Sequence, residues 1–201
     1  MIKSALLFFA LAVTATLTRA ASSSLEGRQL ACNDTYVYFA RGTAEPGTLG
    51  LVVGPGFKNE ISLALLGKTT LFEGINYPAL PLGYFSGGDR RGAKAMADNV
   101  SLTAFRCPKA RIFISGYSQG AQVTHLAARQ LSTSDQDRVT GVVTFGDPYR
   151  DTPLPGVLQS RRKTYCNAGD LVCDGLPLIL GPHLAYGRDL ADAANWIAAR
   201  V

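Results

Sequence analysis

The chain has 201 residues, of which 47% are hydrophobic and 17% are charged. This composition excludes a disordered chain, and the length is typical of a single domain. The formal net charge is +5, but the basic residues are scattered without interleaved aromatic residues, which argues against a nucleic-acid-binding surface.

The N-terminus has the pattern of a secretory signal peptide. Lys3 provides a positive start, an apolar run covers residues 5–13, and Thr18 and Ala20 are small residues placed before a cleavage site. The run is too short to span a bilayer, and no later stretch approaches the about 18 apolar residues that a membrane helix needs. We therefore predict a secreted protein without integral membrane association. Its parts are a signal peptide over 1–20, a mobile segment over 21–30 and one domain over 31–201.

The four cysteines are an even number in a secreted context, which favours disulfides over metal ligation. Four cysteines allow three pairings. The separation of seven residues between Cys166 and Cys173 suits a local bridge, which leaves Cys32 and Cys107 for a long-range bridge. The local bridge would enclose Asp170 and restrain it.

Strand and helix patterns alternate along the domain. β-Branched, aromatic and apolar residues predict strands over 34–40, 71–76, 110–115, 140–145 and 163–166. Apolar spacing and end signals predict helices over 57–66, 89–105, 119–131 and 189–201, and Gly and Pro mark loops over 41–50 and 77–88. This alternation predicts an α/β fold. Its mostly parallel five-stranded sheet has helices on both faces and binds ligands beyond the carboxyl ends of the strands.

The sequence Gly116-Tyr-Ser-Gln-Gly120 matches the Gly-x-Ser-x-Gly pattern of a nucleophilic serine. The pattern is weak by itself, but here a predicted strand leads into Gly116 and a predicted helix starts at Gln119, which is the setting that the motif requires. The glycines permit the tight turn that strains the serine backbone. Ser118 is therefore the predicted nucleophile, and the alternative is a glycine-rich turn with an idle serine.

A serine hydroxyl needs a base, and the chain offers two histidines. His125 lies on the same predicted helix as the turn, about 10 Å along its axis, and cannot reach back to Ser118. We expect His125 on the surface or in the core. His183 lies in a loop near the chain end, where the order serine, acid, histidine places the base. The alternative for His183 is a loop histidine without a catalytic role.

An acid between Ser118 and His183 would orient the imidazole. The candidates are Asp135, Asp137, Asp147, Asp151, Asp170 and Asp174. Asp170 is favoured because a strand precedes it and the expected local disulfide restrains it. Asp147 remains a rival, because it follows the carboxyl end of a predicted buried strand.

The developing oxyanion needs prepositioned donors. The backbone N–H of Gln119 is one of them, since it follows the nucleophile. The loop after the first strand can aim the N–H of Thr43, and its hydroxyl, at the same point, although that loop could also be an ordinary glycine turn. The two histidines have no carboxylate cluster at ligand spacing, so we predict no metal and no cofactor.

Two apolar segments should flank Ser118. One contains Leu80, Tyr84 and Phe85, and the other spans residues 176–180. They could pack in the core, or they could form an exposed crevice that receives acyl chains. For the crevice, we predict substrate contacts from Leu80, Tyr117, Ile179 and Leu180.

Four separated motifs together resemble the fungal cutinase family. They are Ala40-Arg-Gly-Thr-Ala-Glu-Pro-Gly47, Gly116-Tyr-Ser-Gln-Gly120, Cys166-Asn-Ala-Gly-Asp-Leu-Val-Cys173 and Pro182-His-Leu-Ala-Tyr-Gly187. The resemblance runs from about residue 32 to the end of the chain. It implies a small α/β-hydrolase without a lid domain. It also implies the triad Ser118, Asp170 and His183, oxyanion donors at Thr43 and Gln119, and the bridges Cys32–Cys107 and Cys166–Cys173.

The motifs also depart from the family pattern. Thr43 stands where the best-known cutinases carry serine, and Phe145-Gly-Asp-Pro148 looks like the acetylxylan esterase version of the family. The resemblance implies a secreted serine esterase that acts on cutin and on short to medium acyl esters through an acyl-enzyme. The alternative is an acetylxylan esterase of the same fold. We expect a monomer whose partner is a polyester or lipid-like ester.

Overall fold

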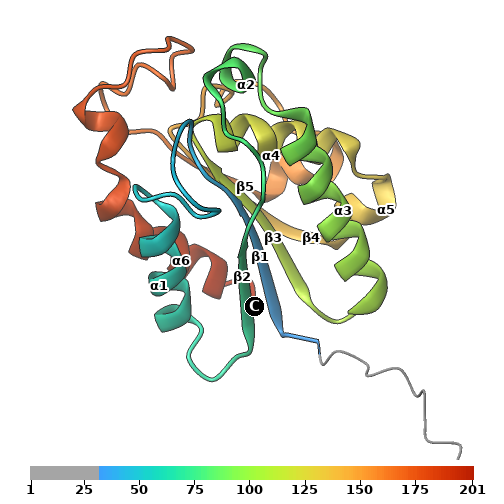
Figure 1. The fold of residues 1–201 in the computed structure, drawn as a ribbon. Coiled ribbons are helices and arrows are strands. Elements are labelled where there is room, and N and C mark those ends of the chain that lie inside the picture. Colours follow the sequence, from blue (N-terminus) through green and yellow to red (C-terminus); the bar gives the residue numbers. More distant parts are fainter. Residues whose placement is uncertain (1–31) are drawn as a thin grey trace, which may run out of the picture. The chain divides into compact units, whose positions relative to one another are not determined.

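A five-stranded parallel sheet forms the centre of this computed structural model, which describes residues 32–201 (Figure 1). Its strands are β1 (Thr35–Ala40), β2 (Thr70–Gly74), β3 (Arg111–Tyr117), β4 (Val139–Phe145) and β5 (Arg162–Tyr165). They lie in the order β2-β1-β3-β4-β5. The predicted α/β fold with five parallel strands is confirmed. The predicted signal peptide over 1–20 and the segment over 21–30 lie outside the described residues.

Helices cover both faces of the sheet (Figure 1). The main helices are α1 (Gly54–Ala64), α3 (Arg90–Arg106), α4 (Gln119–Gln130) and α6 (Leu190–Ala198), and the shorter ones are α2 (Pro81–Phe85) and α5 (Thr133–Arg138). Short 3-10 turns cover Gly156–Arg161, Gly181–Leu184 and Tyr186–Asp189. α1 and α6 lie on one face, whereas α3 and α4 lie on the other.

β1 shows how the sequence builds both cores. All six of its residues are buried, because neither face of the sheet is open to solvent. Val37 and Phe39 pack with α1 and α6, whereas Tyr36 and Tyr38 pack with α3 and α4. Successive side chains of a strand point to opposite faces, so an unbroken apolar run supplies two separate cores.

Two short helices depart from the predicted elements. α2 lies inside the predicted loop over 77–88 and begins at Pro81, whose fixed φ suits a first helical position. α5 lies in a polar segment, where Ser132 caps it by accepting a hydrogen bond from the Asp135 N–H at 3.1 Å. Neither segment has enough apolar periodicity to reveal a helix in the sequence.

Both disulfides are present in the pairing that the spacing favoured, Cys32–Cys107 and Cys166–Cys173. The first ties the entry of β1 to the end of α3. Within residues 32–201, no helix combines the length and the apolarity that a membrane crossing needs.

The register of the sheet brings the loops of interest together. Ala40 pairs with Gly116, Tyr117 with Phe145, and Phe145 with Tyr165. The carboxyl ends of β1, β3, β4 and β5 therefore lie at one edge of the sheet, and the loops that carry the candidate residues leave from that edge.

Candidate active site

Ser118 occupies the strained turn between β3 and α4. Its φ of 56° and ψ of −120° lie outside the regions that L-residues prefer. A Cβ on Gly116 would lie 2.1 Å from the carbonyl oxygen of Gly120, and a Cβ on Gly120 would lie 1.9 Å from the carbonyl oxygen of Ala40. Both glycines are therefore required by close backbone approach, and the strand–turn–helix arrangement expected of the motif is present.

His183 pairs with Asp170 in the interior. The two oxygens of the Asp170 carboxylate lie 2.9 and 3.0 Å from Nδ1 of His183, and the two residues are only 2% and 1% exposed. An ionised carboxylate can only accept, so Nδ1 carries the hydrogen and Nε2 is left as the basic nitrogen. Nε2 has no hydrogen-bond partner among residues 32–201.

The Asp170 carboxylate is held by further donors. The backbone N–H of Val172 donates to Oδ1 at 3.0 Å, and the hydroxyl of Tyr186 donates to Oδ2 at 2.5 Å. Burial, together with the neighbouring carboxylate, raises the pKa of Tyr186, so its hydroxyl stays protonated and available as a donor. The Cys166–Cys173 bridge closes the loop around Asp170. The orientation of Asp170 is therefore determined by side-chain, backbone and covalent contacts.

His183 and Ser118 flank the same turn after β4. The backbone N–H of Ser118 donates to the carbonyl of Phe145 at 3.0 Å. On the other side, a Cβ on Gly146 would lie 2.7 Å from Cε1 of His183. Tyr117, which precedes the serine, stacks on the His183 ring with centroids 5.0 Å apart and donates its hydroxyl to the His183 carbonyl at 2.9 Å. These contacts bring Ser118 and the Asp170–His183 pair to one place.

Asp147, the rival acid, lies in a different buried cluster. Its Oδ2 lies 3.0 Å from Nε2 of His125 and 3.0 Å from Nη2 of Arg162, and Oδ1 accepts the N–H of Tyr149 at 2.8 Å. Burial opposes the charge, but the contacts with His125, Tyr149 and Arg162 together lower the pKa of Asp147. His125 is fully buried, so the core expectation holds for it and the surface expectation does not.

The Gln119 side chain links the strained turn at Ser118 to two other loops. Its Nε2 donates to Oγ1 of Thr43 at 3.1 Å and to the carbonyl of Leu80 at 2.8 Å. The structure thus places Thr43 and Gln119 together, as candidate oxyanion donors must be.

Glu45 organises the loop that carries Thr43. Its carboxylate accepts the backbone N–H groups of Gly42, Leu51 and Val52 at 2.7 to 2.8 Å. Arg41 stiffens the same loop by donating to the carbonyl of Glu45 at 2.7 Å. A loop held at this many points can keep a backbone donor in a fixed position.

An apolar cleft of about 220 Å³ opens at Ser118. It is lined by Thr43, Pro81, Tyr84, Phe85, Ser118, Val172, Pro177 and Ile179. Both apolar segments expected at the rim contribute to this lining, and Phe85 and Ile179 remain 70% and 59% exposed.

The other predicted substrate contacts, Leu80, Tyr117 and Leu180, are not among the residues that line this cleft. Leu80 and Leu180 are 55% and 47% exposed and are not among its lining residues. Tyr117 is only 3% exposed and lies against His183, so its side chain does not line the cleft. The sequence shows that Tyr117 precedes Ser118, but it does not show whether the Tyr117 side chain faces the cleft or packs beneath it.

Sequence reasoning missed the contacts that Tyr186, Val172 and Glu45 make. Tyr186 is three residues after His183, but both lie in short 3-10 turns with no periodicity to place their side chains. In the sequence, nothing distinguishes Glu45 from any other acidic residue in a loop. Among the described residues, no group of three or more His, Cys, Asp or Glu side chains is placed to hold a metal ion.

Comparison with known proteins identifies the family of this chain. The family profile for cutinases matches residues 31–201. A cutinase of Coprinopsis cinerea, CUT1, is 69% identical over 179 residues, which are 89% of this chain and 89% of the relative. Among solved structures, the Trichoderma reesei cutinase in complex with a C11Y4 phosphonate inhibitor superposes with a TM-score of 0.79 at 36% identity. The match covers 84% of this chain and 76% of that one.

An acetylxylan esterase solved at 0.90 Å resolution superposes with a TM-score of 0.68 at 24% identity, covering 85% of this chain and 99% of that one. That likeness concerns the fold alone. The family profile and the Coprinopsis relative place the sequence more narrowly, and the chain belongs to the cutinase family of carboxylic ester hydrolases.

Proposed function

We propose that the chain is a secreted serine esterase that hydrolyses cutin-type polyesters and short to medium acyl esters. The observation that carries this proposal is the position of Ser118. It lies on a strained elbow beside the buried Asp170–His183 pair and lines an apolar cleft. Every proposed catalytic group comes from one chain, so a single chain is sufficient to form the site, and the proposed active species is a monomer.

The reaction proceeds through an acyl-enzyme. Oγ of Ser118 attacks the ester carbonyl carbon while its proton passes to Nε2 of His183. The protonated imidazole, stabilised by Asp170, then gives that proton to the leaving alcohol as the carbon–oxygen bond breaks. Water, activated by the same nitrogen, attacks the acyl-enzyme and releases the acid. Nε2 of His183 has no hydrogen-bond partner among residues 32–201, and in this proposal its hydrogen bond with Oγ of Ser118 forms when substrate binds, as catalytic hydrogen bonds commonly tighten in the substrate complex.

The negative charge of the tetrahedral intermediate is held by the N–H groups of Gln119 and Thr43. The Gln119 side chain fixes the Thr43 hydroxyl at 3.1 Å, so one residue supplies a backbone donor and positions the other donor. Tyr117 has a supporting role in place of the expected substrate contact, because it stacks on the His183 ring and holds the His183 backbone.

The chemistry of the cleft favours acyl chains. Most of its lining side chains are aliphatic or aromatic, and two of them, Phe85 and Ile179, are 70% and 59% exposed. Apolar surface of this kind gains free energy when it covers a hydrocarbon chain and gains little from a hydrated sugar. This is the physical reason to prefer a polyester over acetylated xylan, despite the fold likeness to an acetylxylan esterase.

A phosphonate probe tests the function directly. An alkyl phosphonate should form a covalent adduct on Ser118, found by mass spectrometry of the peptide that contains residues 116–120. The unlabelled enzyme should release acid from C4 to C8 p-nitrophenyl esters and from cutin faster than acetate from xylan. Labelling of another residue would contradict the nucleophile, and faster acetate release would favour the acetylxylan esterase.

Secretion is supported by the two disulfides, which persist in oxidising compartments. N-terminal sequencing of the protein recovered from culture medium should find a start close to residue 21. Recovery of full-length chain inside the cells would contradict the predicted signal peptide.

Removal of the Cys166–Cys173 bridge should lower turnover. The double variant Cys166→Ser/Cys173→Ser frees the loop that holds Asp170, and a displacement of about 1 Å at a catalytic group can cost about 10²-fold in rate. We therefore expect kcat for p-nitrophenyl butyrate to fall about 10-fold or more, with little change in KM.

The matched control is Cys32→Ser/Cys107→Ser. Loss of that longer loop closure should cost about 4 to 5 kcal/mol of stability, against about 2 to 3 kcal/mol for the short one. At a temperature where both variants are folded, the control should keep its kcat. Equal kcat in the two variants would contradict the proposal that the short bridge positions Asp170.

A further inference from the structure

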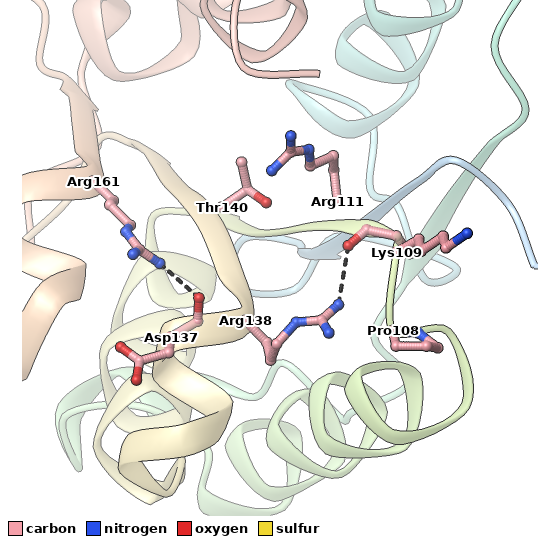
Figure 2. A pocket seen from close by; sticks show the side chains of 8 residues that line it. Pro108, Lys109, Arg111, Asp137, Arg138, Thr140 and Arg161 are labelled. Atoms are coloured by element: carbon pink, nitrogen blue, oxygen red, sulfur yellow. Dashed lines mark hydrogen bonds between the residues drawn. The ribbon is translucent and has the colours of Figure 1, made fainter.

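A second cavity, of about 320 Å³, lies at the opposite edge of the sheet (Figure 2). It is lined by Pro108, Lys109, Ala110, Arg111, Asp137, Arg138, Thr140 and Arg161. Arg111 begins β3 and Thr140 lies near the start of β4, so the cavity is at the amino ends of these strands. The candidate catalytic residues follow the carboxyl ends. The two sites can therefore be occupied at the same time.

Two guanidinium groups in this cavity are already held in place. Nη2 of Arg138 donates to the carbonyl of Ala110 at 3.3 Å, and Nη1 of Arg161 donates to the carbonyl of Asp137 at 2.9 Å (Figure 2). Nη1 of Arg161 also donates to the carbonyl of Val139 at 2.7 Å. These bonds use one nitrogen of each group. Nε and Nη2 of Arg161 remain able to donate in the fork geometry that binds carboxylate and phosphate with two parallel hydrogen bonds. Arg138, which is bonded through Nη2, keeps Nε and Nη1 as single donors.

The charge of the cavity is unbalanced. Lys109 and Arg111 are exposed at its rim and add two further positive charges. Within residues 32–201, none of the four cations lies within 4.0 Å of a carboxylate oxygen. The acidic residue of the lining, Asp137, interacts with Arg161 through its backbone carbonyl. In the sequence these cations are scattered, and only the fold brings them together.

We propose that this cavity binds a multivalent oxyanion, either a free polycarboxylate or phosphate, or the same acidic groups on a polymer. The backbone already orders Arg138 and Arg161, so binding loses less side-chain entropy than it would at mobile arginines. The Cys32–Cys107 disulfide anchors the residue before Pro108 and so steadies one wall. An anionic polymer held here would keep the enzyme on its surface with the ester cleft open.

The test is a citrate titration at constant ionic strength, followed by amide chemical shifts. We expect saturable shifts at residues 109–111 and 137–140 and none around Ser118. The variant Lys109→Gln/Arg111→Gln removes two rim charges that make no ion pair, and it should weaken citrate binding about tenfold or more. The matched control, Lys58→Gln/Lys68→Gln, makes the same change in net charge at exposed positions outside the cavity and should bind citrate as the unmodified protein does.

Equal weakening in the cavity variant and the control would show general charge screening and overturn the proposal, as would shifts spread over the whole surface. Polygalacturonate separates the two sources of the ligand. If the polymer binds more tightly per carboxylate than citrate does, and the cavity variant loses this binding, the site takes a polymer. If only citrate binds, the site takes a free anion. Turnover of p-nitrophenyl butyrate should be unchanged in the cavity variant, so this test is independent of the esterase proposal.

Discussion

Replacement of Ser118 by alanine should lower kcat for p-nitrophenyl butyrate by at least about 10⁴-fold, with KM little changed. In the proposed mechanism the Ser118 hydroxyl oxygen forms the acyl-enzyme. Removal of a nucleophile from a triad leaves only the residual catalysis of the oxyanion donors and of binding. The cleft keeps its lining, so substrate affinity should survive. Steady-state kinetics measures both kcat and KM, provided that the protein concentration is determined by a method that does not depend on activity.

Ser115 provides a matched control for this variant. It is a fully buried serine in β3, three residues before Ser118, and its hydroxyl has no hydrogen-bond partner among the described residues. Ser115→Ala should therefore change kcat by less than about twofold, because the substitution breaks no bond. Activity of Ser118→Ala near that of the control would show that another residue is the nucleophile and would end the proposed mechanism.

Replacement of Asp147 by asparagine should destabilise the fold by about 3 to 5 kcal/mol at pH 7. Asp147 is fully buried between His125 and Arg162, and loss of its charge leaves Arg162 buried without a carboxylate. Removal of one partner from a buried ion pair has a cost of this size. Urea denaturation followed by circular dichroism measures the free energy of unfolding.

The effect of this substitution should depend on pH. The pKa of Asp147 is lower in the folded protein, so its stabilisation is present above the unfolded value of about 3.9 and is lost as the pH falls through the folded value. The difference between unmodified protein and variant should be constant above about pH 5 and shrink below about pH 4.

Asp98→Asn is the surface control for Asp147→Asn. Asp98 pairs with Lys94 on α3, and the two side chains are 61% and 70% exposed, so this pair should contribute less than about 0.5 kcal/mol. If Asp147→Asn lowers the free energy of unfolding no more than Asp98→Asn does, the cluster of His125, Asp147 and Arg162 does not stabilise the fold.

The sequence was sufficient for the features that depend on local pattern. Largely apolar runs identified the three central strands, β1, β3 and β4, because both of their faces are covered. The edge strands β2 and β5 are partly exposed, and β-branched and aromatic residues indicated them instead. Gly116 and Gly120 marked the elbow, since no other residue fits backbone atoms that approach this closely. Chain order then placed His183 as the candidate base. These inferences need only neighbouring residues or their order.

Pairings between distant side chains could not be read from the chain. Spacing left Asp147 as a rival to Asp170, and only the tertiary structure shows that Asp147 faces His125 and Arg162. Tyr186 donates to Asp170 across a separation of 16 residues through two 3-10 turns that have no pattern to predict their direction.

The basic cavity at the amino ends of β3 and β4 likewise depends on tertiary structure and not on local sequence pattern. Lys109, Arg111, Arg138 and Arg161 are spread over about fifty residues of the sequence. They meet because β3, β4 and β5, which these residues precede or begin, are adjacent parallel strands. The sequence by itself indicated the family and the sheet and predicted Ser118 as the nucleophile, because these features depend on local spacing. The partners of each buried charge were decided by tertiary packing, because contacts between loops depend on backbone directions that no short stretch of residues encodes.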